Sequence, residues 1–322
     1  MKSRASDLRG AGLVILAAAC FGTLGPLSDV ADRAGVTSLS LVTWRGTLGA
    51  ACMVAFVAWQ SVAARRLPQP IGLLPARDRW AMAAAALANA VLNLAVFIAF
   101  LRIGIAMALL IFYLYPAFVA LISVVWFGER LDRLRWSALA ISLTGMVLVV
   151  AGANALGEVD LFGIGLSLLA AISQTFYVLA ARHGFARVPG AQAAGLTMAG
   201  AAAIYLGVAA ATGSLGSLVQ PLASAAAFWP VLVAGVVGAG IPTLAFITGI
   251  RLLGAPRAAI LATFEPVVGV ALAALLLGQQ PTLVQLLGGA MIISAGVVLQ
   301  LRPRAGAVAE HEAVVDASEA AA

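Results

Sequence analysis

Long apolar runs, separated by short polar segments, fill the chain from residue 11 to residue 301. The hydrocarbon core of a bilayer is about 30 Å thick, so a helix needs about 20 mostly apolar residues to cross it. The runs are continuous, whereas the strands of a membrane barrel alternate in polarity. The sequence therefore predicts an all-α integral membrane protein with ten transmembrane helices. We expect them at 11–29, 37–60, 80–100, 105–127, 135–153, 161–181, 191–212, 228–249, 257–277 and 283–301.

Composition excludes a soluble fold. Hydrophobic residues make up 63% of the 322 residues and charged residues 10%, whereas soluble domains are about half apolar and about one quarter charged. The net charge of +6 does not indicate a nucleic-acid partner, because the basic residues lie in short clusters between apolar runs. We therefore expect the bilayer to be the main surroundings of the chain.

The first apolar run allows a second interpretation. Lys2, Arg4 and Arg9 precede a stretch that ends at Cys20, as in a cleaved signal or lipoprotein segment. Because similar runs continue down the chain, we favour a first membrane helix. Cys20 and Cys52 both lie in apolar runs, which argues against a disulfide framework.

The basic residues also predict an orientation. With ten spans, sixteen of the nineteen Lys and Arg residues fall on one side, Arg33 and Arg102 on the other, and Arg45 within a span. Positive residues are retained in the cytoplasm. We therefore expect a cytoplasmic N-terminal segment at 1–10 and a cytoplasmic, disordered tail at 302–322.

An internal repeat divides the chain. Gly104–Gly128 aligns without gaps with Gly254–Gly278 at an offset of 150 residues, which favours duplication. The repeats would occupy residues 11–153 and 161–301. Five spans is an odd number, so the second half would enter the membrane inverted. In transporters of that architecture, the substrate site lies near the bilayer midplane between the halves.

Each repeat has a proline near the middle of its fourth span. Pro116 aligns with Pro266 at the same offset. Proline removes a backbone donor and kinks a helix. Such kinks can be hinges or static packing features, and the sequence does not choose between them.

Three segments resemble a known family. They are YLYPAFVALISVVWFGERL (Tyr113–Leu131), ATFEPVVGVALAALLLGQQ (Ala262–Gln280) and WRGTLGA (Trp44–Ala50). They are similar to the drug/metabolite transporter (DMT) superfamily, most of all to its EamA-type ten-helix transporters. The resemblance covers residues 11–301. It implies a multi-pass transporter of the bacterial inner membrane that carries amino acids or other metabolites. The chain departs from the family pattern at Gln279, where many members have the Glu found here at Glu129.

Two ionisable residues lie well inside the expected spans, where charges are costly and usually functional. Arg45 could meet an anionic substrate group, or it could snorkel or fix helix packing; the resemblance favours a structural or gating role. Burial disfavours the charged form of a carboxylate, so Glu265 could be protonated and couple transport to protons. Glu265 could instead pair with Arg45 or bond to a neighbouring helix.

Several uncharged residues are further candidates for substrate contact. Asn89 and Asn93 share one helix face, and Gln174 is a similar intramembrane amide. These side chains could bind a polar substrate or join helices. The aromatic residues Trp44, Phe112, Tyr113 and Tyr115 could line an apolar pocket, although such residues more often pack or anchor at interfaces.

These features favour a secondary transporter that exports a small metabolite by alternating access, without a metal or cofactor. No GxxxxGK[ST] motif is present. Multidrug efflux is an alternative, but the first span has no acid before Asp29. An enzyme is not expected, because His183 and His311 lie outside the spans and no Asp pair lies within one. A receptor or scaffold is a weaker alternative. Small-residue faces such as Ala290 and Ser294 could also mediate a homodimer.

Overall fold

The computed structural model describes residues 4–63, 68–151, 160–277 and 281–301. Every regular element in these ranges is a helix, which confirms the all-α prediction for them. The expectations for Lys2, for the 302–322 tail and for Gln279 lie outside the described residues.

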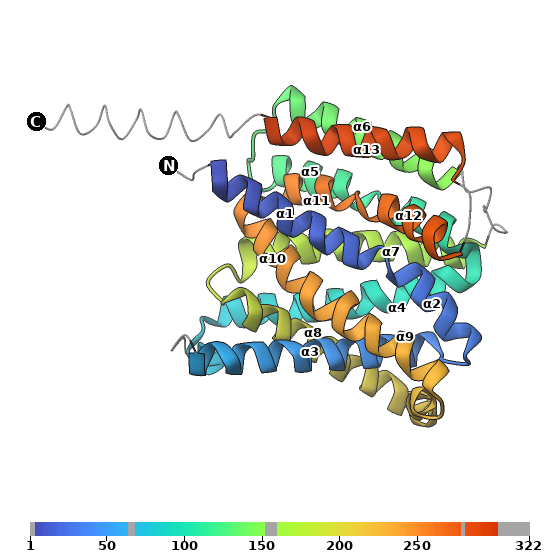
Figure 1. Cartoon of the computed structure of the whole chain (residues 1–322). Helices are drawn as coiled ribbons and strands as arrows, with labels where there is room; N and C mark the ends of the chain where they lie inside the picture. Colours follow the sequence, from blue (N-terminus) through green and yellow to red (C-terminus); the bar gives the residue numbers. More distant parts are fainter. Residues whose placement is uncertain (1–3, 64–67, 152–159, 278–280, 302–322) are drawn as a thin grey trace, which may run out of the picture.

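The chain forms long helices broken at a few defined points (Figure 1). The α-helices are α1 (Arg4–Phe21), α2 (Leu24–Arg33), α3 (Ser38–Ala63), α4 (Ala76–Phe112), α5 (Tyr115–Val125), α6 (Arg133–Ala151), α7 (Leu161–Leu179), α8 (Gly190–Ala211), α9 (Ala225–Gly235), α10 (Ile241–Leu253), α11 (Ala255–Ala262), α12 (Glu265–Leu277) and α13 (Leu283–Leu301). Short 3-10 helices occur at η1 (Ile71–Leu73) and η3 (Leu215–Leu222), and π-helical turns at η2 (Ala180–Gly184) and η4 (Val236–Gly240).

Nine stretches of the described residues are long and apolar enough to cross a membrane. They are Ala5–Arg33, Ser38–Ala63, Ala76–Ile105, Met107–Val125, Arg133–Ala151, Leu161–Gly184, Gly190–Ala211, Ala225–Leu253 and Ala255–Leu272. The apolar helix Leu283–Val298 is shorter. Ten spans therefore stay a prediction. Large apolar side chains such as Val125, Trp126 and Leu275 are exposed on the outside of the bundle, as a hydrocarbon solvent allows.

The fourth segment of each repeat begins at a glycine with a positive φ. Gly104, inside α4, has φ 76° and ψ 156°, and Gly254, between α10 and α11, has φ 91° and ψ 159°. L-residues with a side chain rarely adopt this conformation, and glycine adopts it freely. The 150-residue offset found in the sequence is thus repeated in the backbone.

We expected each of the two prolines to kink a continuous helix, and neither does. The helices stop before them: α4 ends at Phe112 and α5 begins at Tyr115, while α11 ends at Ala262 and α12 begins at Glu265. Pro116 and Pro266 are each the second residue of the new helix. Proline is tolerated in this first turn because the amide hydrogen that it lacks has no partner in the helix.

The equivalent helices α3 and α8 pack closely and run antiparallel. Gly46 lies against Ala202, Gly49 against Met198, and Gly195 against Met53, so the contacts move backwards along α8 as they move forwards along α3. Small residues at these points let the two backbones approach, which is how helices associate in membranes.

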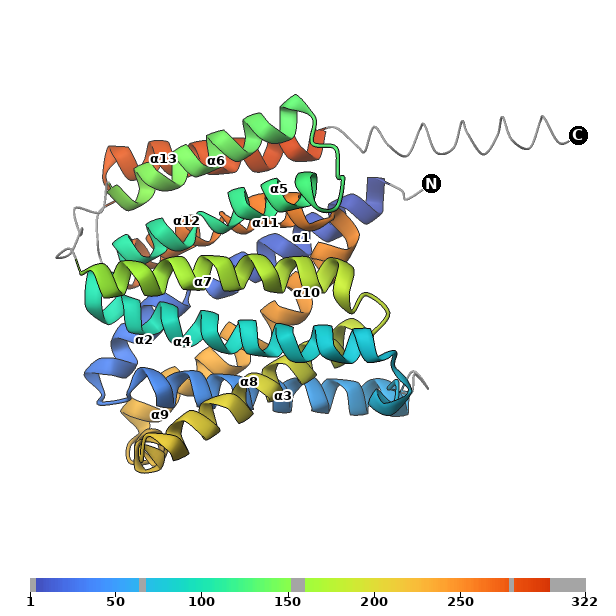
Figure 2. The same ribbon diagram turned by 180° about the vertical axis from the view of Figure 1, so that it is seen from behind.

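The helices α6 and α13 form a second close pair at one edge of the bundle (Figures 1 and 2). A Cβ at Gly145 would lie 2.6 Å from the carbonyl oxygen of Gly288. The bounds of α6 and α13, Arg133–Ala151 and Leu283–Leu301, differ by the 150-residue offset at both ends.

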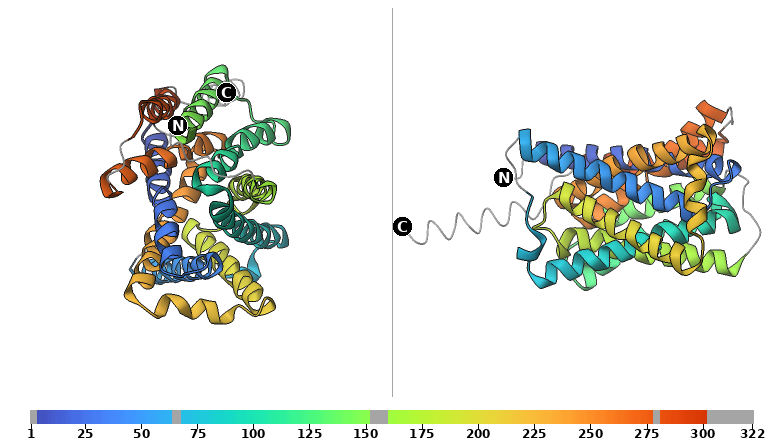
Figure 3. Two further views of the ribbon diagram at one scale, coloured as in Figure 1. Left: turned by 90° about the vertical axis from the view of Figure 1, so that its right-hand side faces the viewer. Right: turned by 90° about the horizontal axis from the view of Figure 1, so that it is seen from below.

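The packing pattern as a whole repeats at this offset. The helix α4 packs against α7, and α1 packs against α10. These two helix pairs are equivalent under the offset. Adding 150 to residues 76–103 of α4 gives 226–253, which include α10. Subtracting 150 from residues 161–179 of α7 gives 11–29, which include most of α1. Viewed along the helices, the elements surround a central region (Figure 3).

Candidate functional site

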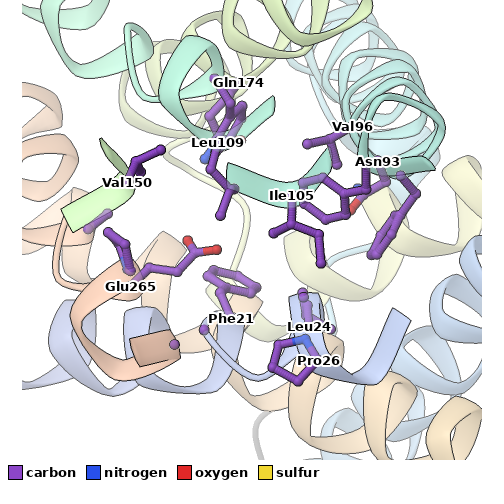
Figure 4. A pocket seen from close by; sticks show the side chains of 18 of the residues that line it. Phe21, Leu24, Pro26, Asn93, Val96, Ile105, Leu109, Val150, Gln174 and Glu265 are labelled. Atoms are coloured by element: carbon purple, nitrogen blue, oxygen red, sulfur yellow. The ribbon is translucent and has the colours of Figure 1, made fainter. Parts of the chain in front are cut away.

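A cavity of about 600 Å³ lies among the helices (Figure 4). Pockets for small molecules typically have about 300–1,000 Å³. Its lining is Phe21, Gly22, Leu24, Gly25, Pro26, Asp29, Arg45, Asn89, Leu92, Asn93, Val96, Phe97, Phe100, Gly104, Ile105, Leu109, Phe112, Tyr115, Val149, Val150, Gln174, Tyr177, Thr243, Phe246, Ala262, Glu265, Pro266, Gly269, Val270, Pro281, Thr282 and Gln285. Both halves of the sequence contribute.

The wall of the cavity is mainly apolar and aromatic. Seven aromatic side chains line it: Phe21, Phe97, Phe100, Phe112, Tyr115, Tyr177 and Phe246. They come from five different helices, so no single helix face in the sequence identifies them. Such a wall suits an apolar or aromatic ligand, and its few polar groups would orient that ligand.

Arg45 is buried in α3 and is held by two other helical segments. Its Nε and Nη2 both donate to the carbonyl oxygen of Gly238, at 3.2 and 2.9 Å, and its Nη1 donates to Oδ1 of Asn93. The Gly238 carbonyl belongs to the π-helical turn η4. The guanidinium therefore joins α3, α4 and η4, as a planar fork with several donors can.

The two asparagines complete this network. Asn93 Nδ2 donates to the backbone oxygen of Asn89 at 2.7 Å and to its Oδ1 at 2.9 Å. Both line the cavity. The Tyr205 hydroxyl, from α8, donates at 3.1 Å to the carbonyl oxygen of Ala90, which lies in α4 beside Asn89. The asparagines thus orient Arg45 and also present polar atoms to the cavity.

Glu265 begins α12 and points from the broken helix into the cavity (Figure 4). Among the described residues, its carboxylate takes part in no ion pair, so the expected alternative of a pair with Arg45 is not observed. The buried Tyr113 hydroxyl lies beside this carboxylate. Within the described part of the chain, Glu265 is therefore an acid without an ion-pair partner that faces the cavity.

The predicted site residues divide into two groups. The cavity brings together Arg45, Asn89, Asn93, Gln174 and Glu265, with Pro266 beside them. Three further predictions, Trp44, Tyr113 and Pro116, lie outside its lining.

These three residues have other surroundings. The Trp44 Nε1 donates to the carbonyl oxygen of Leu218 at 2.7 Å, which joins α3 to η3. Tyr113 is fully buried and packs against the rings of Phe112 and Tyr115. Pro116 is buried in the first turn of α5.

Sequence reasoning missed some of the polar lining. Thr243 lines the cavity and is the residue 150 positions after Asn93. Applying the repeat to each candidate would have found it. Gln285 and Thr282 also line the cavity, and no sequence signal distinguishes them from ordinary residues at a helix start.

Ion pairs lie toward the two ends of the bundle. Arg257 Nη1 is 3.0 Å from Asp7 Oδ2, with both side chains largely buried, so that α1 is tied to α11. Arg102 Nη1 is 2.8 Å from Asp160 Oδ2 at the other end, and the Arg102 guanidinium covers the Phe162 ring. The hydrogen bond from Arg102 holds the pKa of Asp160 below its ordinary value.

Glu129 is not part of the cavity. Its Oε1 lies 3.6 Å from His183 Nε2, and the His183 ring stacks on Phe127 with centroids 3.9 Å apart. This contact joins the segment after α5 to the turn η2. Glu129 is therefore accounted for as a structural contact between the two halves.

A family model now identifies the chain. The model of the EamA-like transporter family matches residues 8–151 and again residues 161–301. The chain belongs to the EamA-like transporter family. This confirms the resemblance to the DMT superfamily, and it makes the chain a multi-pass membrane transporter of the DMT type.

Solved structures share the fold. A structure titled only as the crystal structure of a protein has a TM-score of 0.73 and 22% sequence identity, over 91% of this chain and 96% of the other. At that identity the similarity concerns the fold alone. No curated protein matches the chain.

Proposed function

We propose that this protein is a secondary transporter that moves a small metabolite, an amino acid or a related compound, across the membrane by alternating access, with export favoured. The observation that carries the proposal is the cavity of about 600 Å³, in which Arg45 and Glu265 from different halves face one mainly apolar space. Transport sites of this kind lie between the repeats near the bilayer midplane.

We propose further that the halves form two inverted repeats of five spans, with domains at 11–153 and 161–301. The antiparallel packing of the equivalent helices α3 and α8 supports the inversion. The offset of 150 residues between α6 and α13 supports a count of ten spans. Gly104 and Gly254, with their matching backbone angles, would then occupy equivalent positions at opposite ends of the bundle.

The proposed state is open away from the cytoplasm. The lining reaches the exposed Asp29 in α2, and also Pro281 just before α13 and Gln285 in its first turn. At the opposite end, every residue of α11 is buried and Arg257 pairs with Asp7. The basic clusters support the proposal that this closed end, with both termini, lies on the cytoplasmic side of a bacterial inner membrane.

Two residues have proposed roles in the cycle. Glu265 couples transport to protons or contacts the substrate, because it is the acid that faces the cavity from the broken ninth span. Arg45 holds the halves in register through Gly238 and Asn93. The interruptions before Pro116 and Pro266 are candidate hinges, since they interrupt the helical hydrogen bonds.

The test is flux of a metabolite panel in proteoliposomes that contain the pure protein, with and without a pH gradient. The proposal predicts saturable flux of at least one compound, and a reduced or pH-independent rate in Glu265→Gln. Matched liposomes with the Gly165→Ala variant serve as a control, because Gly165 has open space around it. Absence of saturable flux for the whole panel would favour a receptor or scaffold and would contradict the proposal.

A second candidate is efflux of toxic or multiple compounds. The seven aromatic side chains of the lining favour it, since such a wall accepts varied apolar molecules. Saturable flux of several unrelated apolar compounds, with mutual competition, would support this candidate over a single metabolite.

A further inference from the structure

The two ionisable groups deep in the cavity differ in what they can offer to a ligand. Arg45 uses Nε and Nη2 on the Gly238 carbonyl. These two donors form the edge of the guanidinium that binds a carboxylate in a bidentate manner. Its Nη1 is also engaged, by Asn93. A carboxylate ligand that bound this edge would have to displace contacts that hold the bundle together.

Glu265 presents the opposite situation. Among the described residues, its carboxylate has no ion-pair partner within 4.0 Å, and the Tyr113 hydroxyl is the polar side-chain group beside it. A carboxylate in an apolar site is strongly stabilised by a cation that reaches it. A cation is therefore the ligand charge that this carboxylate would bind best.

The surrounding wall fits the same ligand class. Phe21 lies beside Glu265 in the cavity (Figure 4), and the rings of Phe112 and Tyr115 also line it, 5.2 Å apart. Aromatic faces attract cations, most strongly where water is excluded. The acid at the mouth, Asp29, is already paired with Arg33 at 2.8 Å.

We propose that the cavity selects a small organic cation, an amine with an apolar or aromatic body and without a free carboxylate, through Glu265. This rests on the proposed transport function and narrows it: among amino acids and related compounds, those that lack the carboxylate are preferred. The amine binds the Glu265 carboxylate, and the apolar body fills the aromatic wall.

The test compares ligands that share a body and differ in charge. Thermal unfolding of the purified, detergent-solubilised protein is measured against concentration of phenethylamine, phenylalanine and 3-phenylpropionate, and of isopentylamine, leucine and 4-methylpentanoate. Ligand binding to the folded state raises the unfolding midpoint, which yields an affinity. The amine of at least one series is expected to bind at least about tenfold more tightly than its zwitterion and its acid.

The variants sharpen the result. Glu265→Gln is expected to lose this preference, while Glu129→Gln, the same change at an acid outside the cavity, is expected to keep it. The inference is overturned if the amine binds more tightly than its zwitterion and its acid in neither series, if no compound binds, or if a folded Glu265→Gln keeps the amine preference. The wild-type series decides the matter even if Glu265→Gln does not fold. Saturable flux of zwitterions or acids in the liposome panel would leave transport intact and refute only the preference for cations.

Discussion

Replacing Arg45 with lysine keeps a positive charge in the membrane but removes the planar fork. A lysine can reach one of the two acceptors, Gly238 O or Asn93 Oδ1, and the other then loses its partner. A buried acceptor left unsatisfied costs about 1–3 kcal/mol, although hydrogen bonds between membrane helices average only about 0.6 kcal/mol. We therefore expect Arg45→Lys to lower the free energy of unfolding by about 0.6–3 kcal/mol.

The larger change Arg45→Leu leaves both acceptors without a partner, and we expect a loss of about 2–6 kcal/mol. Unfolding of the purified protein in mixed micelles, followed by fluorescence of its six tryptophans, measures both variants. A double-mutant cycle that combines an Arg45 variant with Asn93→Ala isolates the coupling free energy between Arg45 and Asn93, which we expect to be about 1–2 kcal/mol. The reasoning is refuted if Arg45→Lys unfolds like the wild type but loses affinity for carboxylate ligands, since Arg45 would then bind substrate.

Three further predictions concern packing and the ion pairs. Gly145→Val forces α6 and α13 apart where they cross, because a Cβ at residue 145 would lie 2.6 Å from the carbonyl oxygen of Gly288. We expect the free energy of unfolding to fall by about 1–3 kcal/mol. If Gly145→Val is as stable as the control Gly165→Ala, this prediction is wrong. Because the pKa of Asp160 is depressed in the folded protein, its ion pair contributes to the free energy of unfolding at pH values above the pKa of Asp in the unfolded chain, about 3.9. This contribution is lost as the pH falls below that value. Arg102→Gln should therefore flatten the acid side of the stability–pH curve, and an unchanged curve would contradict this. Asp7→Ala leaves Arg257 without its carboxylate partner and should lower stability by about 1–4 kcal/mol, whereas Asp29→Ala, at the exposed Asp29–Arg33 pair, should change it by less than about 1 kcal/mol.

Much of the fold follows from the sequence because lipid makes hydrophobicity directly informative. Continuous apolar runs must be helical in a bilayer, since backbone groups have no water to bond. The repeat was visible in the alignment of Gly104 with Gly254 and Pro116 with Pro266, and the backbone angles and helix starts follow the same offset. Family membership was predicted from three short segments and confirmed.

The breaks within helices were less predictable. The sequence indicates a mid-span feature at each proline, but it does not distinguish a kink from a full interruption. The break at Gly22–Thr23, between α1 and α2, has the same local cause as the other two, because Pro26 follows Gly22 by four residues and lacks the amide hydrogen that would bond to the Gly22 carbonyl. Its packing was not predictable: Gly22 lies against the start of α12, where a Cβ would be 2.7 Å from the carbonyl oxygen of Glu265. Such a contact between distant segments leaves no local pattern.

The site was predicted in part. Arg45, Glu265 and the intramembrane amides were found because polar groups are rare and costly in a membrane. Trp44 could not be assigned from sequence, since the direction of its side chain depends on its hydrogen bond to Leu218. Phe21 and Phe246 join the wall only through tertiary packing, with their rings edge to face at 6.2 Å.

The central claim is that one cavity between the two halves is reached from alternating sides of the membrane. In a background with Cys20→Ser and Cys52→Ser, a cysteine in place of Leu109, which lines the cavity, reports access to a membrane-impermeant thiol reagent. The account predicts labelling from the side of Arg33 and Arg102, protection by a transported compound, and new labelling from the side of the termini when Asp7→Ala weakens the closed end. Equal labelling from both sides while the Asp7–Arg257 ion pair is intact would contradict the account. So would labelling that a transported compound does not change.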